Sequence, residues 1–130
     1  MVNEPIMCTR DLGYSYRDKK VLECINLSVG KGEILGILGP NGCGKSTLLK
    51  NLNKNLNPDR GCVMVDGDDL ADMKKRNIAR RVSVVPQSNE IKFAFTVREI
   101  VEMGRMPFQE TFRDSGIDDE AIVREAMEQT

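Results

Sequence analysis

The chain has 130 residues, the usual size of one compact domain, and 40% of them are hydrophobic, which is enough for a core. Its 19 basic and 20 acidic residues give a net charge of −1, so no overall field attracts nucleic acid or an anionic membrane. The sequence contains no histidine, which excludes a Ser-His-Asp triad and a histidine metal site from these residues.

The cysteines and the N-terminus indicate the cellular compartment. The four cysteines are widely spaced and form no Cys-x-x-Cys pair, so neither a zinc site nor a thioredoxin-like site is predicted. The first five residues lack the basic and apolar regions of a secretory signal. The longest apolar run, Ile34 to Leu38, is far shorter than the ~20 residues of a membrane helix. We therefore expect a cytosolic chain with reduced thiols that reaches a membrane only through a partner.

The N-terminal third is predicted to form β-structure. Residues 6–12 and 13–16 are expected as two short strands separated at Gly13. Residues 21–29 alternate in polarity, which predicts a half-buried antiparallel strand whose inward residues are Val21, Ile25, Leu27 and Val29. Residues 34–38 are apolar on both faces, which predicts a fully buried strand.

The rest of the chain alternates between predicted helices and short strands. A helix is expected over residues 45–56, with one apolar stripe formed by Leu48, Leu49, Leu52 and Leu56. Short strands are expected at 62–65 and 82–85, a helix between them at 72–80, and a loop at 87–95.

Two helices are predicted near the C-terminus. Thr96 and Glu99 have the spacing of a capping box, which predicts a helix that begins there and ends near Met103. Acidic residues at 118–120 suit the N-terminus of a last helix. The inward residues of that helix are expected to be Ile122, Val123, Ala126 and Met127.

A phosphate-binding motif lies between the predicted buried strand and the helix that follows it. The pattern G-x-x-x-x-G-K-[ST] occurs as Gly39-Pro40-Asn41-Gly42-Cys43-Gly44-Lys45-Ser46, followed by Thr47. Glycines allow consecutive backbone N–H groups to point at an anion, and the positive end of the helix adds to their attraction. Lys45 is expected to reach the β- and γ-phosphates, and the Ser46 hydroxyl is the expected Mg²⁺ ligand.

Two other nucleotide-binding motifs match this region less well. A dinucleotide-binding fingerprint requires a third glycine at position 47, where the sequence has Thr47. A guanine-reading Asn-Lys-x-Asp motif fails because Asn53-Lys54-Asn55 is followed by Leu56.

Residues around the loop extend the pattern and resemble the opening of ATP-binding cassette (ABC) ATPases. They are Tyr16, Val21-Leu22, Leu27-Ser28-Val29, Gly32-Glu33-Ile34, Thr47-Leu48-Leu49, Pro58, Gly61-Cys62-Val63 and Asp66-Gly67. The segment Val84-Val85-Pro86-Gln87 resembles the approach to the glutamine loop of that family. Residues 96–101 and 104–107 are similar to the branch that energises import of iron–siderophore complexes, haem or cobalamin.

The resemblance implies an α/β fold: a P-loop NTPase core with an N-terminal antiparallel β subdomain, truncated before the helical signature region. The implied parts are an antiparallel region at 1–32, the P-loop core at 33–86, the glutamine loop at 87–95 and the start of a helical subdomain at 96–130. The family's Leu-Ser-Gly-Gly-Gln signature, its acidic strand end and its switch histidine are absent from the sequence. The chain therefore resembles the N-terminal half of such a domain.

The resemblance also implies roles for individual residues. Tyr16 is expected to stack on adenine, with Tyr14 as a competitor and a core tyrosine as the alternative. Lys45 and Gln87 are expected to act in hydrolysis, and Ser46 and Gln87 to contact Mg²⁺. The remaining nucleotide contacts are expected from Val21, Gly39, Asn41, Gly42, Cys43, Gly44 and Thr47.

The implied function is that of a subunit which binds and hydrolyses ATP to power import across a membrane. Its expected partners are a membrane permease, contacted by the 87–95 loop, and a second ATP-binding subunit, with no nucleic acid. Its expected location is the cytoplasmic face of the cell membrane. A non-transport ABC ATPase and a nucleotide-binding fragment without enzymatic activity are the alternatives.

Two expectations concern the 130 residues alone. Without parallel neighbours, the 34–38 segment should expose its apolar side chains and favour self-association. Without the signature motif and a catalytic base, the chain should hydrolyse little or no ATP.

Overall fold

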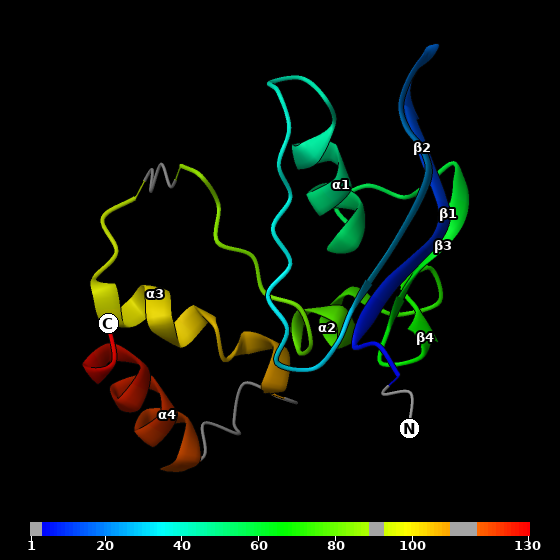
Figure 1. The fold of residues 1–130 in the computed structure, drawn as a ribbon. Helices are drawn as coiled ribbons and strands as arrows, with labels where there is room; N and C mark the ends of the chain where they lie inside the picture. Colours follow the sequence, from blue (N-terminus) through cyan, green and yellow to red (C-terminus); the bar gives the residue numbers. More distant parts are fainter. Residues whose placement is uncertain (1–3, 89–92, 110–116) are drawn as a thin grey trace. The chain divides into compact units, whose positions relative to one another are not determined.

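A computed structural model of the chain describes residues 4–88, 93–109 and 117–130 (Figure 1). The backbone forms two compact units, Met1–Ser83 and Val84–Thr130, and each is described by itself. This division leaves the finer boundaries expected at residues 32, 86 and 95 untested.

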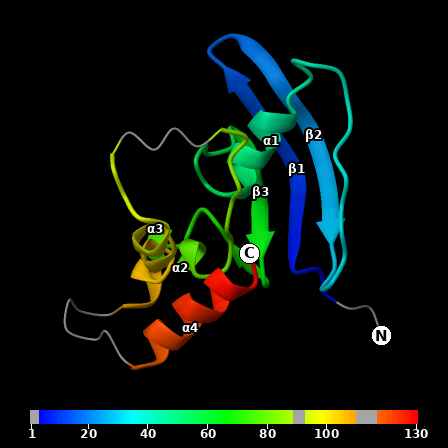
Figure 2. The ribbon, with the colours of Figure 1, turned by 90° about the vertical axis from the view of Figure 1, so that its left-hand side faces the viewer.

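The first unit contains a four-stranded antiparallel sheet with the order β2-β1-β3-β4. Its strands are β1 (Met7–Tyr16), β2 (Lys19–Val29), β3 (Arg60–Val65) and β4 (Asp68–Asp69). Figure 2 shows β1 between β2 and β3. The prediction of antiparallel structure in the N-terminal third is therefore confirmed.

Strand β1 is continuous, so the predicted break at Gly13 is wrong. Gly13 stays in the ladder opposite Arg60, and its carbonyl accepts a hydrogen bond from the Asp59 N–H at 2.9 Å. The register of β1 with its neighbours shifts at β-bulges instead of at a break in the strand. One bulge lies at Asp11, whose φ of 46° is left-handed.

Strand β2 keeps most of its predicted inward face. Val21, Ile25 and Leu27 pack against the core as expected. Cys24 has a φ of 49°, and the β1–β2 register shifts between Leu22 and Ile25. This bulge turns Leu22 inward, so that Leu22 is buried although the alternation did not include it among the inward residues.

Helix α1 (Lys45–Leu52) begins where predicted but ends one turn earlier than residue 56. Lys54 takes a left-handed φ of 59°, and the Leu56 N–H bonds back to the Lys50 carbonyl at 2.9 Å, which closes the helix end. Only part of the predicted stripe is buried, because Leu48 and Leu52 face inward while Leu49 is 51% exposed.

The core of the first unit joins this helix to the inner face of the sheet. Its buried apolar residues are Leu12, Leu22, Leu48, Leu52, Val63, Val65, Leu70 and Ile78. Ile78 comes from α2 (Lys75–Ala79), a shorter helix than the predicted 72–80. Strand β3 agrees with the strand expected at 62–65.

Two predicted strands, 34–38 and 82–85, are not paired with any described residue. Ile34 and Leu38 are each 96% exposed although Ile37 packs against the core, so the prediction of a fully buried strand at 34–38 is wrong. The short strand predicted at 82–85 is also wrong, and Val85 is 93% exposed. The physical reason is that a strand becomes buried only when neighbouring strands satisfy its backbone and cover its faces. The separate expectation that an isolated 34–38 segment exposes apolar surface is confirmed.

The described residues of the second unit form helix α3 (Val97–Met103), the 3₁₀ turn η1 (Met106–Phe108) and helix α4 (Ile117–Glu128). Val123 is the buried member of the inward face predicted for α4, whereas Ile122 and Met127 are 41% and 37% exposed. No helix in the described ranges is long and apolar enough to cross a membrane.

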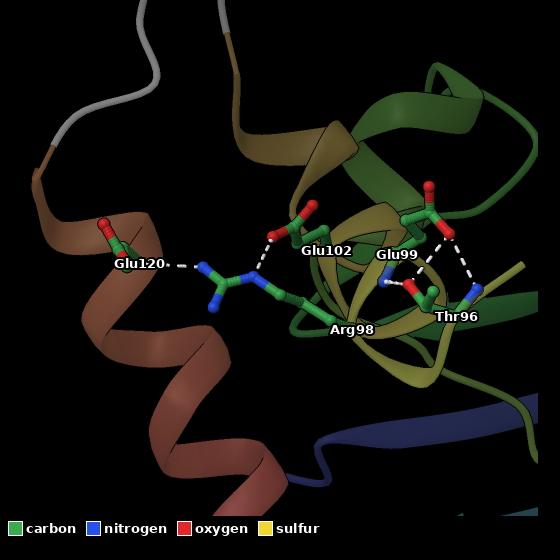
Figure 3. Close-up of polar contacts among 5 residues, drawn as sticks. All are labelled: Thr96, Arg98, Glu99, Glu102 and Glu120. Carbon is green, nitrogen blue, oxygen red and sulfur yellow. Dashed lines mark hydrogen bonds and ion pairs between the residues drawn. The ribbon is translucent and has the colours of Figure 1, made fainter.

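The predicted capping box of α3 is present (Figure 3). The Glu99 N–H donates to Thr96 Oγ1 at 3.3 Å, and Glu99 Oε2 accepts from the Thr96 N–H at 2.7 Å. Arg98 joins the two helices, since it bonds Glu102 on α3 at 2.7 Å and Glu120 on α4 at 3.3 Å.

A second ion pair connects η1 to α4. Arg105 Nε lies 2.7 Å from Asp119 Oδ1, and its guanidinium carbon is 4.4 Å from the centre of the Phe108 ring. The Arg105 and Gln109 side chains donate to Asp119 and hold the pKa of its carboxyl below its usual range.

Candidate nucleotide site

The glycine-rich loop at residues 39–46 leads directly into α1. Gly42 and Gly44 have φ values of 81° and 102°, which side chains other than glycine rarely adopt. Gly44 is the N-cap of the helix, and its carbonyl accepts the first helical hydrogen bond, from the Leu48 N–H at 2.8 Å. The two glycines thus turn the chain so that the N-terminus of α1 adjoins the loop.

Lys45 is folded into this loop. Its ammonium nitrogen lies 2.6 Å from the Gly39 carbonyl, 2.8 Å from the Pro40 carbonyl and 3.7 Å from Cys43 Sγ. The first turn of α1 has no acidic residue, so this cation lies at the positive end of a helix dipole without a neutralising carboxylate from that turn. An anionic ligand would supply the missing negative charge.

The loop is braced against strand β2. A Cβ on Gly44 would lie 3.2 Å from Val21 Cγ1 and 3.1 Å from Leu22 Cδ2. The structure therefore places Val21 beside the loop, and its contact with the nucleotide stays a prediction. The role of Leu22 as a supporting residue could not be predicted, because the bulge that turns it inward has no clear signal in the sequence.

The residues on either side of Lys45 differ in their exposure to solvent. Ser46 is exposed at the first turn of α1, where its hydroxyl is accessible to a ligand. Thr47 is buried, so it offers a ligand its backbone rather than its side chain. Asn41 and Cys43 are exposed on the loop.

The two candidate adenine-binding tyrosines differ in their surroundings. Tyr14 packs against the core, and burial, followed by the charges of Tyr16 and Asp59, raises the pKa of its hydroxyl. Tyr16 is 44% exposed at the end of β1 and meets the Tyr14 ring edge-on at 5.0 Å. Tyr16 thus has more free ring surface for stacking, supported from one side by Tyr14.

Asp59 is a positioning residue that sequence analysis did not single out. Its Oδ2 accepts from the Ser15 N–H at 2.6 Å, and its own N–H donates to the Gly13 carbonyl at 2.9 Å. These bonds hold the end of β1, next to Tyr16. The only sequence signal was the turn-like composition of Pro58-Asp59-Arg60-Gly61.

Gln87 and the 87–95 loop belong to the second unit and are described with it, apart from the phosphate loop of the first unit. Gln87 is exposed. Phe93 and Phe95 are 74% and 44% exposed with ring centres 6.2 Å apart, while residues 89–92, including Ile91, lie outside the described residues. The expected roles of Gln87 and of this loop stay predictions.

The loop residues fit a nucleotide with its Mg²⁺. The Lys45 cation and the N-terminus of α1 suit phosphate, and the exposed Ser46 hydroxyl is an oxygen ligand of the kind that Mg²⁺ prefers. The described residues contain no cluster of three or more Cys, Asp or Glu side chains that could hold a metal by themselves.

The sequence model described as ABC transporter matches residues 22–130. The chain belongs to the ABC transporter family. Among solved structures, the ATP-binding subunit of an ABC transporter aligns with a TM-score of 0.73 at 27% identity, over 82% of this chain and 44% of that chain. The α/β class and the N-terminal antiparallel region of an ABC ATPase, expected from the sequence, are thereby confirmed.

Curated ABC relatives include subunits of importers. An ABC transporter ATP-binding protein of Bacillus subtilis, YvrA, is 46% identical over 95% of this chain and 28% of its own length. The iron(3+)-hydroxamate import ATP-binding protein of the same organism is 36% identical over 95% of this chain and 46% of its own length. The hemin import ATP-binding protein of Thermobifida fusca is 41% identical over 96% of this chain and 43% of its own length. The chain thus spans less than half the length of these relatives.

Proposed function

We propose that this chain is the nucleotide-binding part of an ATPase subunit that powers import across a membrane, with iron complexes as the transported substrate. The observation that carries the ATP part is the loop at residues 39–46, where the Lys45 ammonium and the N-terminus of α1 converge. The import part rests on the relatives, which include iron-hydroxamate and hemin import proteins.

In this proposal, the loop binds the phosphates. Backbone N–H groups of residues 42–47 hold the phosphate oxygens, and Lys45 exchanges its carbonyl partners for the β- and γ-phosphates. Gly39 and Asn41 border the site, and Val21 and Tyr16 hold the nucleoside end.

Mg²⁺ bound with ATP would neutralise the charge that develops on the transferred phosphoryl group. Ser46 is the proposed ligand on α1, and Gln87 the proposed second ligand and orienter of the attacking water.

The proposed partners follow from the family. A membrane permease would receive the 87–95 loop, whose Phe93 and Phe95 are exposed, and a second ATP-binding subunit would complete the nucleotide site. The protein would then lie at the cytoplasmic face of the membrane without entering it.

Nucleotide affinity provides the direct test. We expect Lys45→Ala to weaken the binding of a fluorescent ATP analogue at least about tenfold, because a charge-assisted contact to phosphate contributes ~1.5–3 kcal/mol. Lys50→Ala is the matched control, since Lys50 is exposed on the same helix and equally charged. Equal affinity of the two variants would contradict the proposal.

The transport role is tested in cells. A strain that depends on the protein containing this chain should lose growth on a ferric hydroxamate or on haem as sole iron source when Lys45 is replaced by Ala, and keep it with Lys50→Ala. Normal uptake of both iron sources by the Lys45→Ala strain would contradict the import proposal while leaving ATP binding to the first test.

A further inference from the structure

A small cavity lies between the end of α1 and the β3–β4 connection in the first unit. Its volume is about 30 Å³, and its walls include Asn51, Lys54, Cys62, Leu70 and Ala71. A site needs only ~10–15 Å³ of such volume to hold a water molecule. The cavity is therefore large enough for a water molecule and far too small for a nucleotide.

Asn51 presents a buried acceptor that lacks a donor. Its side chain is 1% exposed, and its Nδ2 donates to the Thr47 carbonyl at 2.9 Å. The orientation of the amide is set by that bond, because a carbonyl can only accept. Oδ1 has no hydrogen-bond partner among the described residues, and a buried acceptor without a donor is unfavourable.

The charges at the wall define the occupant. The Lys54 ammonium donates to the carbonyls of Leu70, Ala71 and Met73 at 2.5, 2.9 and 2.8 Å, which uses all three of its protons. Asp69 also lines the cavity, and its Oδ1 accepts from the Ala71 N–H at 2.8 Å. The charged side chains at the wall are thus one cation and one carboxylate, which balance and favour neither a metal ion nor an anion. What fits is a small neutral molecule with two protons to donate.

We propose that this cavity binds one ordered water molecule, which donates one proton to Asn51 Oδ1 and the other to the carbonyl oxygen of Ala71. The Ala71 carbonyl accepts a bond from Lys54 and keeps a second lone pair, whereas the Leu70 carbonyl accepts from both Lys54 and the Met73 N–H. The water then links the end of the helix that follows the phosphate loop to the β3–β4 region. This site is separate from the nucleotide loop and does not rest on the proposed function.

Water–protein nuclear Overhauser effects test the proposal on the protein that carries this chain with its natural flanking sequence. We expect a long-lived water to give cross-peaks with the Asn51 side-chain amide and the Ala71 backbone N–H. Asn51→Leu, of similar volume but without polar atoms, should abolish the Ala71 cross-peak. Asn55→Leu is the matched control, because Asn55 is exposed just after the same helix, and it should retain both cross-peaks.

A crystal structure of the unaltered protein gives a second readout that does not depend on a variant folding. We expect density for one water within hydrogen-bond distance of Asn51 Oδ1. A protein N–H donating to that oxygen, a dry cavity, or an Ala71 cross-peak that survives Asn51→Leu would each overturn the proposal.

Discussion

Cys43 is the residue that most distinguishes this phosphate loop chemically. Its thiol is exposed, it lies 3.7 Å from the Lys45 ammonium, and a Cβ on Gly39 would lie only 2.7 Å from its sulfur. The thiol therefore occupies the space between the two ends of the loop. Any group added to it would compete with phosphate for the loop interior.

Complete alkylation of Cys43 is accordingly expected to block nucleotide binding. The measurement is the affinity for a fluorescent ATP analogue before and after treatment with N-ethylmaleimide. Cys43→Ala is the control, because it leaves the other cysteines to react and should bind equally well with and without the reagent. Unchanged ATP affinity after complete Cys43 modification would refute this prediction.

Among the secondary-structure elements, α3 has the most clearly defined beginning. Thr96 and Glu99 satisfy each other's backbone N–H groups, as their spacing predicted (Figure 3). The Thr96 backbone N–H and, with a smaller effect, the Thr96 hydroxyl donate hydrogen bonds to the Glu99 carboxylate. These bonds hold the pKa of the Glu99 carboxyl below its usual range.

Thr96→Ala is expected to destabilise α3 by ~1 kcal/mol, the usual cost of losing an N-cap side chain. Thr96→Ser, which keeps the hydroxyl, should be close to the unaltered protein. The measurement is amide hydrogen exchange over residues 97–103. Equal protection in the Ala and Ser variants would show that the cap does not stabilise the helix.

The capping box also has a pH dependence with a defined sign. Because the pKa of Glu99 is lowered in the folded state, its contribution to stability is present above its unfolded pKa and is lost as the pH falls through the folded value. Exchange protection of α3 should thus weaken on acidification more in the unaltered protein than in Glu99→Gln. The same acid sensitivity in both would contradict this assignment.

For the chain as a whole, the most consequential feature is the exposed 34–38 segment. Ile34 and Leu38 are nearly fully exposed, and the backbone between them is not paired with a described strand. Unpaired extended backbone with apolar side chains is a template for association with another chain.

The purified 130-residue chain is therefore expected to self-associate at micromolar concentration. Light scattering after gel filtration measures this, and the double change Ile34→Lys with Leu38→Lys should reduce it. Met106→Lys alters an exposed apolar residue in the second unit and should have little effect. A monomer that unfolds cooperatively at this concentration would count against the prediction.

ATP turnover by the same 130 residues is expected to be negligible. The chain has no histidine and no Leu-Ser-Gly sequence, and the ABC ATPases that it resembles use both a signature motif and a switch histidine. Phosphate release should match that of Lys45→Ala, which measures contaminating activity. Substantial turnover that Lys45→Ala abolishes would prove the prediction wrong.

Features that depend on neighbouring residues could be predicted from the sequence. The turn made by Gly42 and Gly44, the beginning of α1 at Lys45 and the α3 capping box were all located correctly. Each of them depends on glycine backbone freedom or on hydrogen bonds between residues three or four apart, so the local sequence is sufficient to specify them.

Features that depend on distant residues were decided by tertiary structure. The bulges at Asp11 and Cys24, and with them the inward turn of Leu22 onto Gly44, arise from pairing between strands. The apolar pattern of 34–38 predicted a buried strand, yet no described residue pairs with it and Ile34 is 96% exposed. Apolar composition indicates that a segment can be buried, but burial itself requires neighbouring strands, and these are contributed by other parts of a fold.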